Sequence, residues 1–114
     1  MAYDEGLAER IRGVLSHRTD VTEKRMFGGL AFLSRGYMLV GINDERLMAR
    51  VGAANYDEAL RQPHVREMDF TKRPIKGFVY VLSDGIQADN DLKTWIDRCL
   101  EFVDTLPDKA DKIK

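Results

Sequence analysis

Two segments of the chain repeat apolar residues at the spacing of an α-helix. The first covers residues 5–17, where Asp4 stands in the N-cap position. The second covers residues 89–105 and is followed by Pro107, which cannot continue a helix. The apolar stripes are Leu7, Ile11, Val14 and Leu15 in the first segment, and Leu92, Trp95, Ile96, Cys99, Phe102, Val103 and Leu106 in the second. Both segments are predicted to be amphipathic helices.

The stretch between these helices is predicted to be mainly sheet. Short apolar or alternating segments cover residues 23–27, 30–34, 37–42, 46–51, 65–70 and 78–82. We interpret the first two as one strand that Gly28 and Gly29 interrupt with a bulge or bend. Short turns at 35–36 and 43–45 favour antiparallel neighbours, and residues 55–61 are predicted to form a short helix.

This order of elements predicts an α+β fold, with helices segregated to one face or end of an antiparallel sheet. A chain of 114 residues and 44% hydrophobic composition has the size and apolar content for one core. We expect one stand-alone domain over residues 5–107, followed by a polar tail over residues 108–114.

Charge and cysteine content narrow the class of protein. The formal net charge of −1 argues against a general nucleic-acid coat or a polybasic membrane binder. Residues 21–82 hold ten basic and seven acidic side chains, whereas residues 83–114 hold five basic and eight acidic ones. With a single cysteine and neither a signal peptide nor a transmembrane run, the sequence predicts a cytoplasmic protein.

Several short motifs resemble the N-terminal domain of TfoX-type competence regulators. They are MFGGLAF at residues 26–32, RVG at 50–52 followed by Tyr56, and MDFT at 68–71 with RP at 73–74 and KG at 76–77. The segment 88–105, with Trp95, resembles the closing helix of that family, so the resemblance runs from residue 5 to residue 107. It implies a curved antiparallel sheet in a two-layer, secretion-chaperone-like architecture, and frequently a homodimer. It also implies a regulatory role, because members of this family influence transcription of competence genes in some bacteria.

Motifs for catalysis and metal binding are missing from the sequence. The residues His17, His64 and Cys99 lie far apart, without the paired spacing of zinc ligands. Neither a nucleophile elbow nor a phosphate-binding glycine loop is present. We therefore expect a protein that is not an enzyme and takes neither metal nor cofactor, with a buried, inert thiol at Cys99.

The basic residues around a Pro/Gly loop form the main candidate binding site. They are Arg66, Lys72, Arg73 and Lys76, and Gly77 lets the backbone come close to whatever the loop meets. The alternative is a solvated loop with local ion pairs to Glu67 or Asp69. Four methionines on predicted strands offer either an adaptable apolar groove or ordinary core, and these are Met26, Met38, Met48 and Met68.

Three functions remain open from the sequence. The first is a non-enzymatic regulatory module that acts through protein contacts, as a homodimer or with another protein partner. The second is direct nucleic-acid binding through the basic 66–77 region, where phosphate contacts would make affinity depend on salt. The third is a small-molecule binder or an undetected enzyme, with a pocket between sheet and helices.

Overall fold

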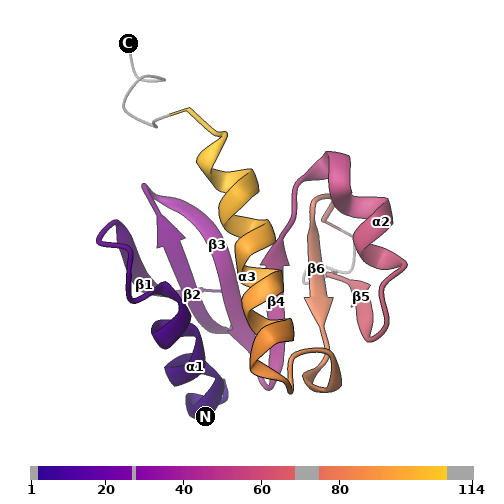
Figure 1. Cartoon of the computed structure of the whole chain (residues 1–114), viewed down its shortest axis with the longest axis horizontal. Helices are drawn as coiled ribbons and strands as arrows, with labels where there is room; N and C mark the ends of the chain where they lie inside the picture. The colour runs from indigo at the N-terminus through magenta and orange to yellow at the C-terminus, as the bar shows by residue number, and fades with distance from the viewer. Residues whose placement is uncertain (1–2, 27, 69–74, 108–114) are drawn as a thin grey trace.

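The computed structural model describes residues 3–26, 28–68 and 75–107, which form a sheet and a set of helices. In chain order the elements are α1 (Glu5–Leu15), β1 (Val21–Met26), β2 (Gly29–Ser34), β3 (Tyr37–Asn43), β4 (Arg46–Arg50), the 3-10 helix η1 (Ala53–Asn55), α2 (Tyr56–Leu60), β5 (Val65–Glu67), β6 (Phe78–Val81), the 3-10 helix η2 (Ser83–Gly85) and α3 (Asp89–Asp104) (Figure 1). The side chain of Asp4 accepts a hydrogen bond from the amide of Leu7 at 3.1 Å, which confirms the predicted N-cap.

The six strands form one antiparallel sheet in the order β1-β2-β3-β4-β6-β5. The first four follow one another as a meander. After α2 the chain enters the sheet at its edge as β5 and returns between β5 and β4 as β6 (Figure 1). The predicted α+β class with a curved antiparallel sheet is therefore confirmed, and the second strand pair belongs to the same sheet as the first four strands.

The prediction of one interrupted strand at Gly28 and Gly29 is wrong. The chain reverses there, so that β1 and β2 are separate antiparallel strands and Met26 lies opposite Gly29. Gly28 has a φ of 73°, in the left-handed region that a tight hairpin turn requires and that glycine adopts readily. A Cβ atom at Gly29 would lie 1.7 Å from the carbonyl oxygen of Ile42 on β3, so this position has no room for a side chain.

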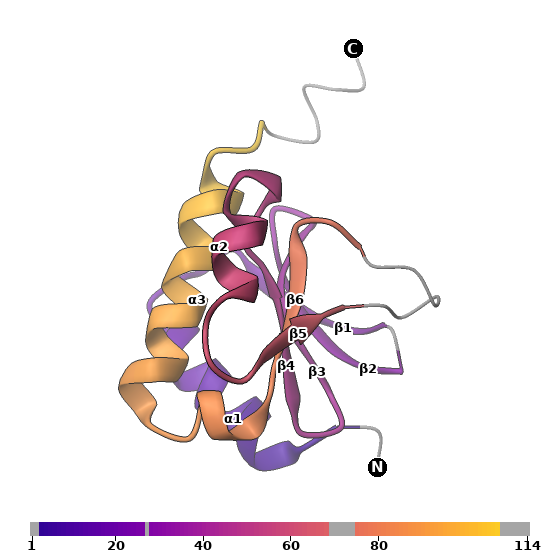
Figure 2. The ribbon, with the colours of Figure 1, turned by 90° about the vertical axis from the view of Figure 1, so that its right-hand side faces the viewer.

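All three α-helices lie on the same side of the sheet (Figure 2). The long helix α3 packs across β3 and β4, α1 packs beside α3, and α2 packs on β5 and β6. The main core fills the layer between helices and sheet. It includes Leu7 and Ile11 of α1, Phe32, Leu39, Leu47 and Val79 of the strands, and Leu92, Ile96 and Cys99 of α3.

None of the described helices is both long and apolar enough to cross a membrane. The helices instead alternate buried and exposed positions. In α3 the buried side chains are those of the stripe read from the sequence, with Leu100 added and Phe102 only partly buried.

Candidate interaction surface

The side of the sheet that faces away from the described helices carries a continuous row of residues. Direct cross-strand partners run from one edge of the sheet to the other in the order Lys24, Ala31, Gly41, Met48, Tyr80 and Arg66. Directly opposite residues share a face, and successive residues of one strand alternate between faces. Since Leu47 and Ala49 belong to the helix-side core, Met48 and its row point to the other side, which we call the helix-free face (Figure 2).

A small apolar cluster occupies the centre of the helix-free face. Its buried members are Ala31, Met38, Met48, Met68 and Tyr80, and Leu33, Ile75 and Phe78 pack around them partly buried. We call this group the methionine cluster. A Cβ atom at Gly41 would lie 2.6 Å from Cε of Met48 and 3.0 Å from Cε of Met38, so both thioether chains lie over this glycine. The side chain of Met26 lies outside the described residues.

Basic side chains flank this cluster. Lys24 on β1 and Arg66 on β5 are exposed at the two edges of the sheet. Between them, the guanidinium carbon of Arg46 lies 4.1 Å from the centroid of the Tyr80 ring, and Arg46 donates to the side-chain oxygen of Asn43 at 2.7 Å. Cation–π contacts of this kind hold an arginine over an aromatic face.

The acidic neighbours of the two edge residues point to the helix side. Glu23, next to Lys24, accepts hydrogen bonds from Arg12 of α1 at 2.7 and 2.8 Å, and these bonds lower the pKa of the Glu23 carboxyl. Glu67, next to Arg66, accepts from the hydroxyl of Tyr56 at 3.4 Å. Burial, followed by the charge of Glu67, raises the pKa of Tyr56. Strand alternation thus directs Glu23 and Glu67 away from the helix-free face, and Arg25 on β1 lies on the helix side together with Glu23.

The predicted basic site is only partly covered by the described residues. Arg66 is exposed on β5, and its guanidinium donates to the backbone carbonyl of Val65 at 3.0 Å. Lys76 is exposed in the turn before β6, and Lys72 and Arg73 lie outside the described residues. Within the described part of the chain, the predicted alternative of a local ion pair from Arg66 to Glu67 is not found, and Asp69 lies outside that part.

Gly77 has a structural contact that the sequence did not reveal. Its φ is 97°, and its carbonyl accepts hydrogen bonds from the amides of Val51 and Gly52 at 2.8 and 3.1 Å. The turn before β6 is therefore fastened to the end of β4. Two of the motifs that resemble the TfoX family, RVG at 50–52 and KG at 76–77, meet at this point.

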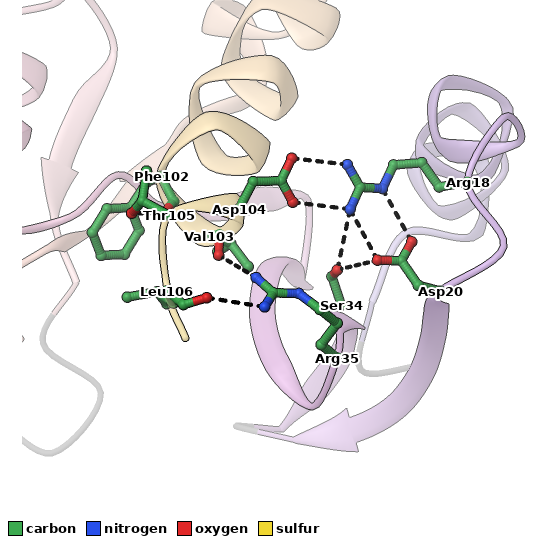
Figure 3. Close-up of polar contacts among 9 residues, drawn as sticks. All are labelled: Arg18, Asp20, Ser34, Arg35, Phe102, Val103, Asp104, Thr105 and Leu106. Carbon is green, nitrogen blue, oxygen red and sulfur yellow. Dashed lines mark hydrogen bonds and ion pairs between the residues drawn. The ribbon is translucent and has the colours of Figure 1, made fainter. Parts of the chain in front are cut away.

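A polar network between the loop before β1, the turn between β2 and β3, and the end of α3 fixes that end of the helix (Figure 3). Arg18 donates to both carboxylate oxygens of Asp104 and to both of Asp20, at distances between 2.9 and 3.1 Å. Ser34 is fully buried and donates to Asp20 at 2.6 Å. At the end of α3, Arg35 donates to the carbonyls of Val103 and Leu106 (Figure 3), and the Val103 carbonyl also accepts from the amide of Leu106.

This network has the contacts of a structural clamp. A serine that attacks a substrate needs a neighbouring base and access to the substrate. Ser34 is buried, and its carboxylate partner Asp20 is a weak base because hydrogen bonds from Arg18 and Ser34 lower the pKa of Asp20 well below its usual range. The same arginine lowers the pKa of Asp104. The network therefore joins α3 to β1 and β2 by charge-assisted hydrogen bonds.

Other candidate chemistry is sparse in residues 3–26, 28–68 and 75–107. No group of three or more histidine, cysteine, aspartate or glutamate side chains there is placed to hold a metal ion. Cys99 is buried, and burial raises the pKa of its thiol to about 12. A surface hollow of about 380 Å³ lies between η2 and α3, lined in part by His64, Trp95 and Arg98.

Sequence reasoning missed two basic residues of the helix-free face, Lys24 and Arg46. The alternation of Arg46, Met48 and Arg50 against Leu47 and Ala49 was the available signal. This alternation places Arg46 on the same face as Met48. The pairing of β1, β2, β3 and β4 is needed to show that Lys24 lies on that face too.

The comparison with known proteins gives one finding. The family model described as the TfoX N-terminal domain matches residues 14–103, which is most of the chain. No curated protein and no solved structure matched the chain.

Proposed function

This chain belongs to the TfoX N-terminal domain family, and from that premise we propose that it is a non-enzymatic regulatory module that contacts protein partners through the helix-free face of its sheet. The observation that carries the proposal is the methionine cluster, which none of the described helices covers. The methionines themselves are buried, and the partly exposed Leu33, Ile75 and Phe78 are the members of the cluster that a partner can reach. Because the methionine side chains beneath them are flexible and polarizable, this surface can adapt to a partner.

The charges on this face favour a partner with acidic side chains. Lys24 and Arg66 are exposed at the two edges of the face, and Arg46 lies between them. A partner that places apolar side chains on Leu33 and Phe78 and carboxylates at the edges would be complementary in both properties. The family resemblance implies a homodimer, so a second copy of this chain is tested too, and it would have to meet this face with a different, acidic part of its surface because its own helix-free face is basic.

Charge reversal at the edges of the face provides the test. Lys24→Glu and Arg66→Glu change exposed side chains, so the fold is expected to survive, and Arg61→Glu is a matched control on the turn after α2. Sedimentation velocity measures self-association, and quantitative affinity capture from lysate measures other partners. The proposal requires that the double variant lose an association that the control retains. A wild-type chain that is monomeric and captures the same proteins as the double variant contradicts it.

Direct nucleic-acid binding is the second candidate function. The observation that favours it is the sorting of charge by strand alternation, which leaves Lys24, Arg46 and Arg66 on one face while Glu23 and Glu67 point to the other. Lys76 precedes β6 and extends the basic region predicted from the sequence. Basic side chains of this kind bind phosphates with an affinity that falls steeply as salt rises.

Fluorescence anisotropy of labelled duplex and single-stranded DNA, at low and physiological salt, tests this candidate. Binding through the basic residues is expected to be salt-sensitive and to be lost in the Arg66→Glu/Lys76→Glu variant, but retained in Arg61→Glu. Absence of binding by the wild-type chain at low salt removes the candidate. The third function, a small-molecule pocket between sheet and helices, would have to open among the buried side chains of the main core.

A further inference from the structure

Arg50, the last residue of β4, differs from the other partly buried arginines. Those are Arg10, Arg12, Arg18, Arg35, Arg46 and Arg98, and each donates to a carboxylate, an amide oxygen or a backbone carbonyl. Arg50 is partly buried too, yet among the described residues its guanidinium has neither a hydrogen bond nor an ion pair. Its five N–H donors are therefore left to solvent or to a ligand.

Aromatic rings surround this guanidinium. Its carbon lies 5.3 Å from the ring centroid of Phe78, 5.6 Å from that of Tyr37 and 5.7 Å from that of Phe102. These rings come from β6, β3 and α3, three elements that the fold brings to the end of β4. Cation–π contacts orient a guanidinium but do not satisfy its N–H donors.

The backbone around Arg50 is arranged so that these rings can approach. Gly52 has a φ of 87°, and a Cβ atom there would lie 2.5 Å from the ring of Phe102. The amide of Gly52 donates a hydrogen bond to the carbonyl of Gly77, which precedes Phe78. Because Gly52 carries no side chain, Phe102 can reach the position beside Arg50.

Burial without an anionic partner leaves this cation uncompensated. Desolvation lowers the pKa of Arg50, whereas the Arg12 and Arg18 guanidinia have raised pKa values because carboxylates bond to them. An incoming anion would restore the missing partner. A planar carboxylate matches the guanidinium fork with two parallel hydrogen bonds. The partly exposed rings of Phe78 and Phe102 offer apolar contact to the rest of the ligand, whereas Tyr37 is buried beneath the guanidinium.

We propose that Arg50, with the partly exposed rings of Phe78 and Phe102, is a recognition site for a carboxylate group attached to an apolar body. The carboxylate accepts from the Arg50 guanidinium, and the apolar body contacts the aromatic side chains. The carrier of this group is either a free organic acid or the carboxylate of a peptide, since both present the same chemistry.

The test is titration of the full ¹⁵N-labelled chain, followed by NMR at the arginine Nε–H signals, with ionic strength held constant by sodium chloride. The probes are benzoate, acetate, inorganic phosphate and a short peptide that ends in phenylalanine. We expect benzoate to shift the Arg50 signal saturably and more tightly than acetate does. Saturation by the peptide at lower concentration than benzoate identifies a peptide carboxylate as the carrier, and the reverse order identifies a free acid.

Two substitutions at Arg50 and one control make the result decisive. Arg50→Lys keeps the charge and most of the stem but loses the fork, so benzoate affinity is expected to fall about ten-fold. Arg50→Gln is expected to abolish the saturable shifts of neighbouring backbone amides, and Arg61→Gln, an exposed arginine, to preserve them. The proposal is overturned by an unsaturable response in the wild-type chain, by equal responses in Arg50→Lys and wild type, or by phosphate binding more tightly than benzoate.

Discussion

Arg18 and Asp104 are joined by two parallel hydrogen bonds of 3.0 Å, although 86 positions separate them in the sequence. The pair connects the loop before β1 with the last residue of α3. The side chain of Arg18 is 19% exposed and that of Asp104 is 47% exposed, so solvent screens the interaction mainly at the carboxylate.

Asp104→Asn should therefore lower the free energy of unfolding by about 1 kcal/mol, because it removes a half-exposed, charge-assisted contact. Asp97→Asn is the matched control, since Asp97 pairs with Lys93 one turn away on the exposed side of the same helix. That change should cost only about 0.3 kcal/mol. Urea denaturation of both variants measures the difference. Equal losses would show that the Arg18 contact contributes no more than an ordinary surface pair.

The same network predicts how stability depends on pH. Hydrogen bonds from arginine lower the pKa of Asp20, Asp104 and Glu23 in the folded chain. Where a carboxyl has a lower pKa folded than unfolded, the unfolded chain binds more protons, so acid favours unfolding. The stabilisation is complete above the unfolded pKa values, about 4, and is lost as pH falls through the folded ones. Urea midpoints between pH 6 and pH 2.5 should show a decline that is shallower in Asp20→Asn. An identical decline in that variant would assign the acid sensitivity to other groups.

Gly52→Ala should destabilise the chain by about 2 kcal/mol, because it combines a left-handed φ with a clash against the Phe102 ring. The clash is separable from the backbone strain. In a Phe102→Ala background the same substitution should cost about 1 kcal/mol less. Chemical denaturation of the two single variants and the double variant provides the cycle. Strict additivity would mean that the strain comes from the backbone alone.

Gly13 and Gly29 should respond in opposite directions to alanine. Gly13 lies in α1, and a Cβ atom added there would meet nothing within 4 Å, so Gly13→Ala should stabilise the helix by about 1 kcal/mol. At Gly29 the carbonyl of Ile42 blocks the site, and Gly29→Ala should cost more than about 3 kcal/mol or prevent folding. Thermal melts compare the two. A neutral Gly29→Ala would show that β2 and β3 can separate without loss.

Cys99 should be unreactive in the native chain at pH 8. Its thiol is buried and its pKa is raised to about 12, so the reactive thiolate is scarce and shielded. A chromogenic disulfide reagent should label it only in urea, with native labelling limited by opening of the structure. Rapid labelling of the native chain would show that α3 opens locally.

Much of the fold follows from periodicity in the sequence. The stripes of α1 and α3 are readable because each extends over several turns, and the turns at Arg35 and Asp44 have short polar sequences. The reversal at Gly28 is easily mistaken for a bulge because two adjacent glycines suit both a bulge and a hairpin. The pairing of Met26 with Gly29, which distinguishes the two, is not a local property.

The candidate surfaces are less accessible to sequence reasoning for the same physical reason. The methionines stand out in the sequence, but strand order and register decide that Met38, Met48 and Met68 share one cluster. Arg50 stands out as a candidate site only because rings from three other elements surround it and because no carboxylate among the described residues pairs with it. The RVG motif at 50–52 and the KG motif at 76–77 lie far apart in the sequence, and the hydrogen bond from the Gly52 amide to the Gly77 carbonyl brings them together in space.

The position of α3 across β3 and β4 has a consequence for synthesis. During translation the sheet-forming residues leave the ribosome before α3 does, and the core they contribute includes Phe32, Leu39 and Leu47. Until Leu92, Ile96 and Cys99 arrive, that apolar layer has no cover from α3. The nascent chain must therefore hold an incomplete sheet with aggregation-prone surface, and folding of this domain is completed only after its closing helix has emerged.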